Sequence, residues 1–324
     1  MSMDKAGRHG VGGGTPGLSL VVPCFNEAPS IKPLYEEVLQ VLDGQSGISD
    51  YELIFVDDGS KDATLEEIKK YAALDGRVHY ISFSRNFGKE AALLAGFAGS
   101  TGKYVVTLDA DMQDPPALIP EMLASVSAGE CDCAAARRVT RKGEPPVRSF
   151  FARCFYRMMA KFAEIDVVDG ARDFRLMTRA YVDAILSLEE RNRFSKGIFP
   201  WVGFRTKWFE YENRSRGSGK TKWSFWRLVI YAFDGIFAFS SKPLAIASVL
   251  GILLFLAALL LIAWILVEKL MGHTVNVYGW ASTVCIILFT SGIQLFSVGI
   301  VGQYLAKTYT EVKRRPHYIV RESA

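Results

Sequence analysis

Two carboxylates stand directly after an apolar segment of strand type, and an amide follows two residues later. The apolar segment is residues 105–108, and the polar side chains are Asp109, Asp111 and Gln113. The tip of a strand presents such groups to a cleft, where their oxygens can hold Mg²⁺ or Mn²⁺ against the phosphates of a ligand. An acidic turn after a strand is the alternative interpretation. The rest of the chain has to decide between the two.

Predicted strands and helices alternate along the first half of the chain. Such alternation predicts right-handed crossovers and a mainly parallel sheet, hence an α/β fold. Ligands of these sheets bind beyond the carboxyl ends of the strands. Polar side chains gather after four of these ends, in residues 23–27, 57–60, 84–89 and 109–113. The predicted strands are 18–22, 52–56, 78–83, 103–108 and 131–136, and the predicted helices are 28–42, 64–74, 90–98 and 115–127.

Two long apolar segments follow this domain. Residues 244–267 and 278–306 contain no charged side chain, and about 20 apolar residues cross the hydrocarbon core of a bilayer. They predict a transmembrane hairpin, with a buried core hairpin as the alternative. The loop between them holds one basic residue, Lys269, whereas more Lys and Arg lie outside the pair. This excess places both flanks, and the domain before them, in the cytoplasm.

The segment before the first apolar span has a different pattern. Aromatic and aliphatic residues recur there at intervals of three and four positions, interrupted by charged residues. This predicts one or two amphipathic helices in the membrane interface over residues 223–242. A helix packed against the soluble domain is the alternative, but the rings of Trp223 and Trp226 favour the interface.

Composition excludes several classes of protein. The net charge is only +4, and no basic stripe interleaved with aromatic residues points to nucleic acid. The five cysteines are odd in number, and their spacings match no zinc framework. Cys131 and Cys133 are interpreted as small apolar residues of a buried strand in a reduced compartment. Residues 1–17 contain six glycines and are expected to be a flexible leader, not a signal peptide.

The order of these strand-end motifs resembles the family 2 glycosyltransferases, whose nucleotide-sugar-binding α/β fold is called GT-A. The resemblance covers about residues 18–223, and residues 108–116, 173–177 and 216–223 are similar to the polyprenyl-phosphate glycosyltransferases within that family. These relatives of dolichol-phosphate mannose synthase move one sugar onto a lipid phosphate, and bacterial members often carry two C-terminal transmembrane helices. The organisation implied is a leader (1–17), a cytoplasmic GT-A catalytic domain (18–222), interfacial helices (223–242), a transmembrane hairpin (243–306) and a basic cytoplasmic tail (307–324).

The resemblance also implies a donor site. An Mg²⁺ or Mn²⁺ ion on Asp109, Asp111 and Gln113 would neutralise the departing nucleoside diphosphate. Position 25 is more commonly Tyr in the family, so any contact that needs a hydroxyl there is absent. Asp58 has the alternative of shaping its turn, and Lys89 that of starting the next helix. The donor-binding residues implied are Pro23, Phe25, Glu27, Asp57, Asp58, Arg85, Lys89 and Asp109.

The acceptor is expected to be a phosphate monoester, which needs fixed cations. The candidates are Arg137, Arg148, Arg216 and Lys222, although a basic segment beside a membrane also attracts anionic lipid. Asp111 and Asp173 are the predicted catalytic residues. A phosphate monoester is mostly dianionic near neutral pH, because its second pKa is about 6. Asp173 is therefore predicted to orient a sugar hydroxyl or Arg175 and not to act as a base.

Together these features predict inverting, metal-dependent transfer of one sugar from UDP-glucose to undecaprenyl phosphate at the inner (plasma) membrane, by a multi-pass protein with both termini cytoplasmic. GDP-mannose is the alternative donor. A processive polysaccharide synthase would carry a Gln-x-x-Arg-Trp motif, which this chain lacks. A non-catalytic nucleotide-sugar-binding membrane subunit would not need Asp111 and Gln113. A second copy of the chain and a downstream flippase are further candidate partners, and small residues such as Gly292 and Gly299 permit close helix packing between copies or within one chain.

Overall fold

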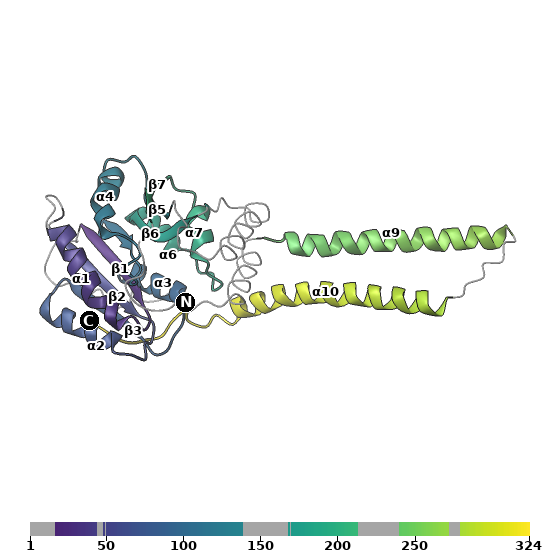
Figure 1. Cartoon of the computed structure of the whole chain (residues 1–324), viewed down its shortest axis with the longest axis horizontal. Coiled ribbons are helices and arrows are strands. Elements are labelled where there is room, and N and C mark those ends of the chain that lie inside the picture. Colours follow the sequence, from purple (N-terminus) through teal and green to yellow (C-terminus); the bar gives the residue numbers. More distant parts are fainter. Residues whose placement is uncertain are drawn as a thin grey trace.

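The computed structural model describes residues 17–43, 48, 50–138, 168, 170–212, 240–271 and 279–324. Figure 1 shows an α/β domain from which two long helices extend side by side. The leader, except for Gly17, and nearly all of the segment predicted to hold interfacial helices lie outside the described residues. The described residues therefore belong mainly to the α/β domain and the two long helices.

One sheet of eight strands organises the domain, in the order β7-β5-β6-β4-β1-β2-β3-β8. β1 pairs in parallel with β2 and β4, β2 with β3, and β5 with β7. β6 runs antiparallel between β4 and β5, and β8 runs antiparallel to β3. The strands are β1 (Leu18–Cys24), β2 (Tyr51–Asp57), β3 (Val78–Phe83), β4 (Tyr104–Thr107), β5 (Cys133–Arg138), β6 (Ala171–Thr178), β7 (Thr206–Tyr211) and β8 (Val320–Ser323).

Helices cover both faces of the sheet because successive strand residues point to opposite sides. Leu20 and Val22 of β1 belong to the apolar core shared with α1 and α4, whereas Val21 belongs to the core on the other face. A Cβ atom on Gly96 would lie 2.1 Å from Val21, so α3 approaches the sheet closely at that glycine. The helices of the domain are α1 (Ala28–Asp43), α2 (Thr64–Leu74), α3 (Lys89–Gly99), α4 (Ile119–Ser127), α6 (Arg179–Leu186) and α7 (Ser195–Trp201), with a short 3₁₀ turn, η1 (Pro116–Leu118).

The prediction that β1 ends before Pro23 is wrong, because the strand continues to Cys24. Pairing with β4 stops at Val21, so Pro23 has a partner strand on one side only. A missing N–H is tolerated where a strand has such an open side. The strand predicted at residues 131–136 lies two residues later, at Cys133–Arg138, and extends the sheet toward the predicted acceptor residue Arg137.

The C-terminal segment contributes a strand to the sheet. β8 pairs with β3, and the backbones of Tyr80 and Ala324 exchange two hydrogen bonds of 2.9 and 3.1 Å. The ring of Tyr318 stacks on Phe83 with centroids 4.9 Å apart. This strand covers the edge of β3, which would otherwise present unpaired backbone groups. The end of the chain thus returns from the long helices to the α/β domain.

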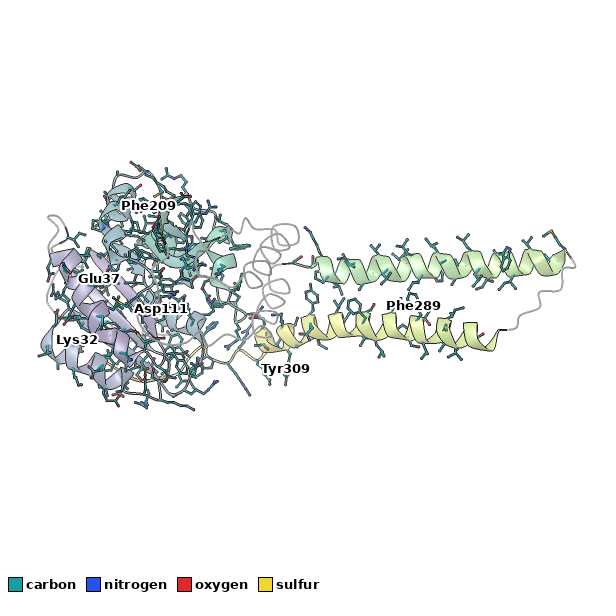
Figure 2. All side chains as sticks on the ribbon, in the orientation of Figure 1. Lys32, Glu37, Asp111, Phe209, Phe289 and Tyr309 are labelled. Atoms are coloured by element: carbon teal, nitrogen blue, oxygen red, sulfur yellow. The ribbon has the colours of Figure 1, made fainter. Side chains whose placement is uncertain are left out.

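The two long helices are α9 (Lys242–Leu270) and α10 (Trp280–Val312). Their segments Lys242–Ile265 and Thr283–Val312, of mean hydropathy 3.0 and 2.2, are long and apolar enough to cross a membrane. Most of their described side chains are exposed, and Phe289, which Figure 2 labels, is one of them. This exposure argues against a buried core hairpin. So much exposed apolar surface indicates that the protein associates with a membrane. The Tyr304 hydroxyl donates to the carbonyl of Ser240 at 2.6 Å and ties the domain-side ends of the helices together.

Candidate active site

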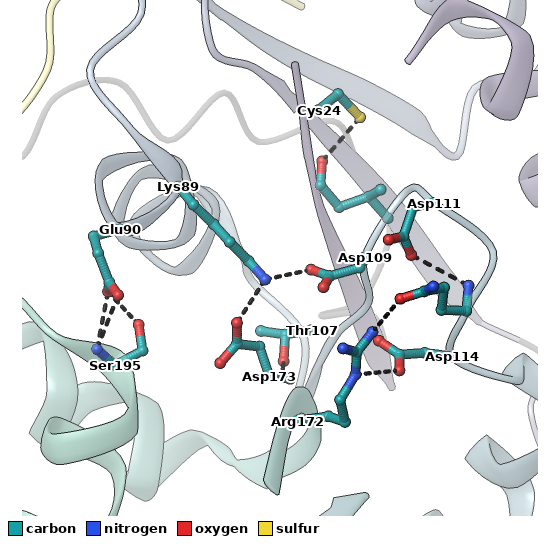
Figure 3. Close-up of polar contacts among 12 residues, drawn as sticks. Cys24, Lys89, Glu90, Thr107, Asp109, Asp111, Asp114, Arg172, Asp173 and Ser195 are labelled. Atoms are coloured by element: carbon teal, nitrogen blue, oxygen red, sulfur yellow. Dashed lines mark hydrogen bonds and ion pairs between the residues drawn. The ribbon is translucent and has the colours of Figure 1, made fainter. Parts of the chain in front are cut away.

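Three charged side chains from three elements meet at the carboxyl ends of the parallel strands. The Nζ atom of Lys89 lies 2.6 Å from Oδ1 of Asp109 and 2.5 Å from Oδ2 of Asp173. Lys89 is the first residue of α3, Asp109 follows β4, and Asp173 lies on β6 (Figure 3). The three side chains are 41%, 21% and 17% exposed, so a ligand can reach them. This cluster is the candidate active site.

The register of β6 brings the two carboxylates together. Thr107 of β4 pairs with Arg175 of β6 in an antiparallel ladder. Asp109 lies two residues beyond the end of β4, and Asp173 lies two residues before Arg175 on β6, so an extension of this register would set the two opposite each other. The hydroxyl of Thr107 also donates to the carbonyl of Asp173 and fixes this end of the ladder. Because carboxylates that face each other repel, the arrangement needs a cation between them.

Lys89 is that cation. The N-terminus of a helix disfavours positive charge, so the position of Lys89 is stabilised by its partners and not by α3 itself. Burial alone would lower the pKa of Lys89, but the charges of Asp109 and Asp173 outweigh it and raise the pKa. Burial would raise the pKa of Asp173, but Lys89 and Lys196 hold it well below its ordinary value. Asp173 is therefore a persistent carboxylate and a weak base.

The remaining part of the predicted metal motif is held by a second cation, Arg172. Its Nη2 donates to Oε1 of Gln113 at 3.2 Å, and its Nε donates to Oδ1 of Asp114 at 3.1 Å. Asp114 is fully buried and also accepts from the hydroxyl of Tyr211 at 2.6 Å. Burial raises the pKa of Asp114, and Arg172 opposes that shift. The backbone N–H of Gln113 donates to Oδ1 of Asp111 at 3.2 Å.

Sequence analysis did not single out Arg172 or Asp114. The available signal was their adjacency to Asp173 and Gln113, since both stand beside a predicted site residue. Arg175, expected as a partner of Asp173, packs its guanidinium 4.3 Å from the ring centroid of Phe199. Among the described residues, the recorded ion-pair partner of Asp173 is Lys89.

Buried carboxylates brace the loops after β2 and β3. Asp57 accepts from the N–H of Ser60 at 3.1 Å and from the hydroxyl of Ser82 at 2.9 Å. Asp58 accepts from the N–H groups of Phe87 and Gly88 at 2.6 and 2.9 Å. Burial raises the pKa of Asp58, and those two hydrogen bonds act against the shift. Both acids therefore have internal partners that account for their burial, and Asp58 supports the turn that leads into Lys89.

Close packing joins these two loops. Gly59 has a φ of +65°, and a Cβ atom there would lie 2.4 Å from the backbone of Arg85. Only glycine combines this backbone conformation with so close an approach. The turn after β2 thus fixes the path of the chain into α3.

The loop after β1 lies against the start of α2. The amide oxygen of Asn26, which has a φ of +53°, accepts from the N–H of Lys61 at 2.8 Å. The N–H of Glu27 donates to the hydroxyl of Thr64 at 2.9 Å, and its carboxylate accepts from Ser30. Phe25 in this loop and Pro23 at the end of β1 are partly exposed. These predicted donor-binding residues therefore stand at the same edge of the sheet as the carboxylate cluster.

Comparison with known proteins identifies the family. Residues 19–186 match the model of glycosyl transferase family 2. The chain belongs to this family. The "Uncharacterized glycosyltransferase sll0501" of Synechocystis sp. is 41% identical over 305 residues, which cover 94% of this chain and 95% of that protein. The "Prophage bactoprenol glucosyl transferase homolog" of Escherichia coli and the "SfII prophage-derived bactoprenol glucosyl transferase" of Shigella flexneri are each 38% identical, over 94% of this chain and 98% of theirs.

Membership of family 2 confirms the predicted enzyme class and the GT-A-like α/β fold. The matched residues contain β1 from Ser19 onward, all of β2 to β6, and the carboxylate cluster. The two apolar helices lie after the matched region. The alignments with the three relatives leave only about 6% of the chain uncovered, so they include most residues of these helices. The protein is therefore a glycosyltransferase whose likeness to these relatives includes its long helices.

The motif after β4 contains the kinds of oxygen ligand that a divalent ion needs. Two carboxylates and an amide oxygen are the hard ligands that Mg²⁺ and Mn²⁺ prefer. Within the described ranges, no three His, Cys, Asp or Glu side chains converge on one point. Asp109, Asp111 and Gln113 are the residues that would hold such an ion. In this structure Lys89 and Arg172 already engage two of these three residues.

Of the other predicted residues, Arg137 and Arg85 lie in the described chain and three lie outside it. Arg137 on β5 has its Nη1 3.8 Å from Oε1 of Glu210. Arg85 lines a separate pocket beside the end of α10. Arg148, Arg216 and Lys222 lie outside the described residues, so their predicted contacts with the acceptor phosphate stay predictions.

Proposed function

We propose that this family 2 glycosyltransferase transfers one glucosyl group from UDP-glucose to a polyprenyl phosphate. The observation that carries the proposal is the likeness along 94% of the chain, long helices included, to relatives named bactoprenol glucosyl transferases. The carboxylate cluster supplies the site, and α9 and α10 supply the means of meeting a lipid substrate. Undecaprenyl phosphate is the proposed acceptor because bactoprenol is a polyprenol of this kind.

The leaving group sets the main electrostatic demand. Departure of a nucleoside diphosphate leaves negative charge on its phosphate oxygens. A divalent ion on Asp109, Asp111 and Gln113 would stabilise that charge. Lys89 and Arg172 would orient the ligand set by holding Asp109 and Gln113. We assign Asp111 the central role, because it lies between these two residues in the sequence of the motif.

The acceptor phosphate provides the nucleophile. One of its oxygens forms the new bond to C1 of the sugar while the bond from C1 to the diphosphate breaks, and the bonding electrons leave with the diphosphate. Such in-line displacement inverts C1 and depends on alignment of the two groups. A dianionic phosphate needs no base, and the low pKa of Asp173 suits it poorly for that role. Asp173 instead positions Lys89 and the donor sugar.

The proposed orientation puts the catalytic domain in the cytoplasm. α9 and α10 enter and leave the apolar region on the same side as this domain, and the Lys and Arg residues of the long-helix region concentrate there. Of the predicted acceptor-binding cations, Arg137 lies in the described chain, at the end of β5. We propose that Arg137, with Arg148, Arg216 and Lys222, receives the lipid phosphate at the membrane surface.

Purified full-length protein tests the proposal. It is incubated with undecaprenyl phosphate and, separately, with UDP-glucose, UDP-N-acetylglucosamine, UDP-galactose or GDP-mannose, with Mn²⁺ or with EDTA. The expected result is a glucosyl phospholipid formed from UDP-glucose only in the presence of the metal. A product formed only from GDP-mannose would overturn the donor assignment. Donor binding without any turnover would overturn the activity.

A further inference from the structure

A cavity lies between the catalytic domain and the end of α10, and the first turn of α3 separates it from the carboxylate cluster. Its volume is about 410 Å³. The segment after β3, the loop between α6 and α7, and the end of α10 with the residues that follow each contribute to its lining. The basic residues among them are Arg85, Arg191, Arg193, Lys313, Arg315 and His317.

The lining carries much more positive than negative charge. Its single carboxylate, Glu90, already accepts hydrogen bonds from the backbone and hydroxyl of Ser195, and burial raises its pKa. Arg193 donates to the carbonyls of Leu188 and Ile185, and Arg85 to that of Asn86. These partners are neutral. Within the described ranges, no ion pair is recorded for any of the five Arg and Lys side chains of the lining.

Neighbouring groups register this excess of positive charge. Burial lowers the pKa of His317, and the charges of Arg191 and Arg193 lower it further. Glu311 acts in the opposite direction, but its carboxylate also accepts from the backbone N–H groups of Arg191 and Asn192 at 2.9 and 3.0 Å. The pocket is therefore a concavity in which five Arg and Lys side chains outnumber the nearby carboxylates, which are Glu90 in the lining and Glu190 and Glu311 beside it. This excess of positive charge suits an anion.

The pocket stands at the level where α10 leaves its apolar region. The uncharged stretch of α10 ends at Ala306, and Tyr309 and Lys313 line the pocket about one and two helical turns further along. The ammonium of Lys313 lies 4.2 Å from the ring centroid of Tyr309. Tyr, Lys and Arg at the end of an apolar helix are typical of the headgroup level of a membrane. Figure 2 shows Tyr309 where α10 meets the catalytic domain.

The pocket is distinct from the carboxylate cluster. Its lining includes none of Asp109, Asp111 and Asp173. Lys89 and Glu90 leave the first turn of α3 in different directions, toward the cluster and toward Ser195 respectively (Figure 3). A phosphate bound in the pocket would contact Glu90's side of α3 and not the proposed metal ligands.

We propose that this pocket binds the phosphate group of an anionic membrane lipid, separately from the transferred acceptor. Arginine forks match phosphate oxygens and are weakly hydrated, which favours phosphate over other anions. The position at the end of α10 favours a lipid over free phosphate, because the acyl chains can remain beside the apolar helix. Such a lipid would join α3, the loop after α6 and the end of α10, and so dock the catalytic domain on the membrane.

Calorimetric titration of the full-length protein in neutral detergent tests the site without any donor sugar. The probes are dioctanoyl phosphatidylglycerol, dioctanoyl phosphatidylcholine and inorganic phosphate. We expect saturable binding of the first at one site per chain, with little binding of the other two. Arg191→Gln and Arg315→Gln should each weaken it about 10-fold or more, as loss of a charged hydrogen bond does. Lys32→Gln, a change on exposed α1 far from Tyr309 in Figure 2, should leave it unchanged.

Several results would overturn the proposal. They are equal binding of phosphatidylcholine, equal binding of inorganic phosphate, or unchanged phosphatidylglycerol binding in both arginine variants with wild-type thermal midpoints. A further contrary result would come from turnover assays in detergent without anionic lipid. If both variants raised the KM for undecaprenyl phosphate about 10-fold there, the pocket would be the acceptor site itself. The binding result stands whatever reaction the enzyme catalyses.

Discussion

Lys89 and Asp173, 84 residues apart in the chain, form an ion pair with 2.5 Å between Nζ and Oδ2. The pair joins the first residue of α3 to the antiparallel strand β6. It also sets the charge state of the site, because Lys89 keeps Asp173 ionised. The same ammonium contacts Asp109, so one side chain holds together the strand that ends in the metal motif and the strand that faces it.

Lys89→Met should destabilise the protein as well as the site. It leaves two facing carboxylates without their cation, which costs several kcal/mol when such charges are fully buried. Because Lys89 is 41% exposed, we expect a smaller loss, of about 1–2 kcal/mol in the free energy of unfolding. Thermal unfolding in detergent measures it. Lys70→Met, which breaks an exposed pair with Glu67, is the control, and an equal effect of the two changes would refute the role of Lys89.

Asp173→Asn should lower kcat/KM without altering the pH profile. The amide keeps the shape of the side chain but loses the charge that holds Lys89, so we expect a fall of about 100-fold, at the lower end of what positioned catalytic groups contribute. Turnover measured from pH 5.5 to 9 checks this. Asp183→Asn, which changes an exposed side chain on α6, is the control. Loss of a titrating limb in the variant would instead show that Asp173 is a base.

The lowered pKa of Asp75 should make the stability of the folded protein depend on pH. The guanidinium of Arg77 lies 2.8 Å from its carboxylate and lowers the pKa of Asp75 to about 2. A carboxyl whose pKa is lower in the folded protein contributes stability above its unfolded pKa, and loses it as pH falls toward the folded value. The shift corresponds to about 2 kcal/mol. Asp75→Asn should therefore lower the thermal midpoint near pH 7, and the gap from wild type should close between about pH 4 and pH 2. A gap that stays constant over that range would contradict the assignment.

Removal of residues 320–324 should expose the edge of β3. The two hydrogen bonds between Tyr80 and Ala324 would be lost, at about 1 kcal/mol each. The uncovered edge should also promote association between chains. Light scattering and thermal unfolding of the shortened protein measure both effects. Glu322→Gln, which removes the ion pairs with Lys69 and Arg321 but keeps the strand, should cause a smaller change. Unaltered scattering and midpoint in the shortened protein would show that β8 does not protect the edge.

The parallel half of the sheet was predictable because its signals are local. The strand Val78–Phe83 and the helix Thr64–Leu74 have the predicted bounds. Each combines an apolar periodicity with polar residues at its ends. β6 and β8 were not predicted, because their partners are distant in sequence. No pattern in residues 171–178 or 320–323 indicates that they pair with β4 or β3. These two antiparallel strands are therefore seen only in the folded structure.

The site divides in the same way. Asp109, Asp111 and Gln113 could be identified from their spacing after an apolar strand. The contacts of Lys89 with Asp109 and Asp173, and those of Arg172 with Gln113 and Asp114, depend on the register of β6. Arg85 was expected to bind the donor, and that stays a prediction. Its side chain also lines the pocket beside α10, which its place in a strand-end loop could not indicate.

The most direct measurement is the rate at which Asp111→Asn forms glucosyl phospholipid from labelled UDP-glucose and undecaprenyl phosphate in Mn²⁺. The account predicts a rate at least about 100-fold below wild type, since loss of a ligand weakens the stabilisation of the leaving diphosphate. Glu121→Gln, which changes an exposed side chain on α4, should retain the wild-type rate. An Asp111→Asn variant that works at the wild-type rate would contradict the central claim that the carboxylates at the tip of β4 carry the reaction.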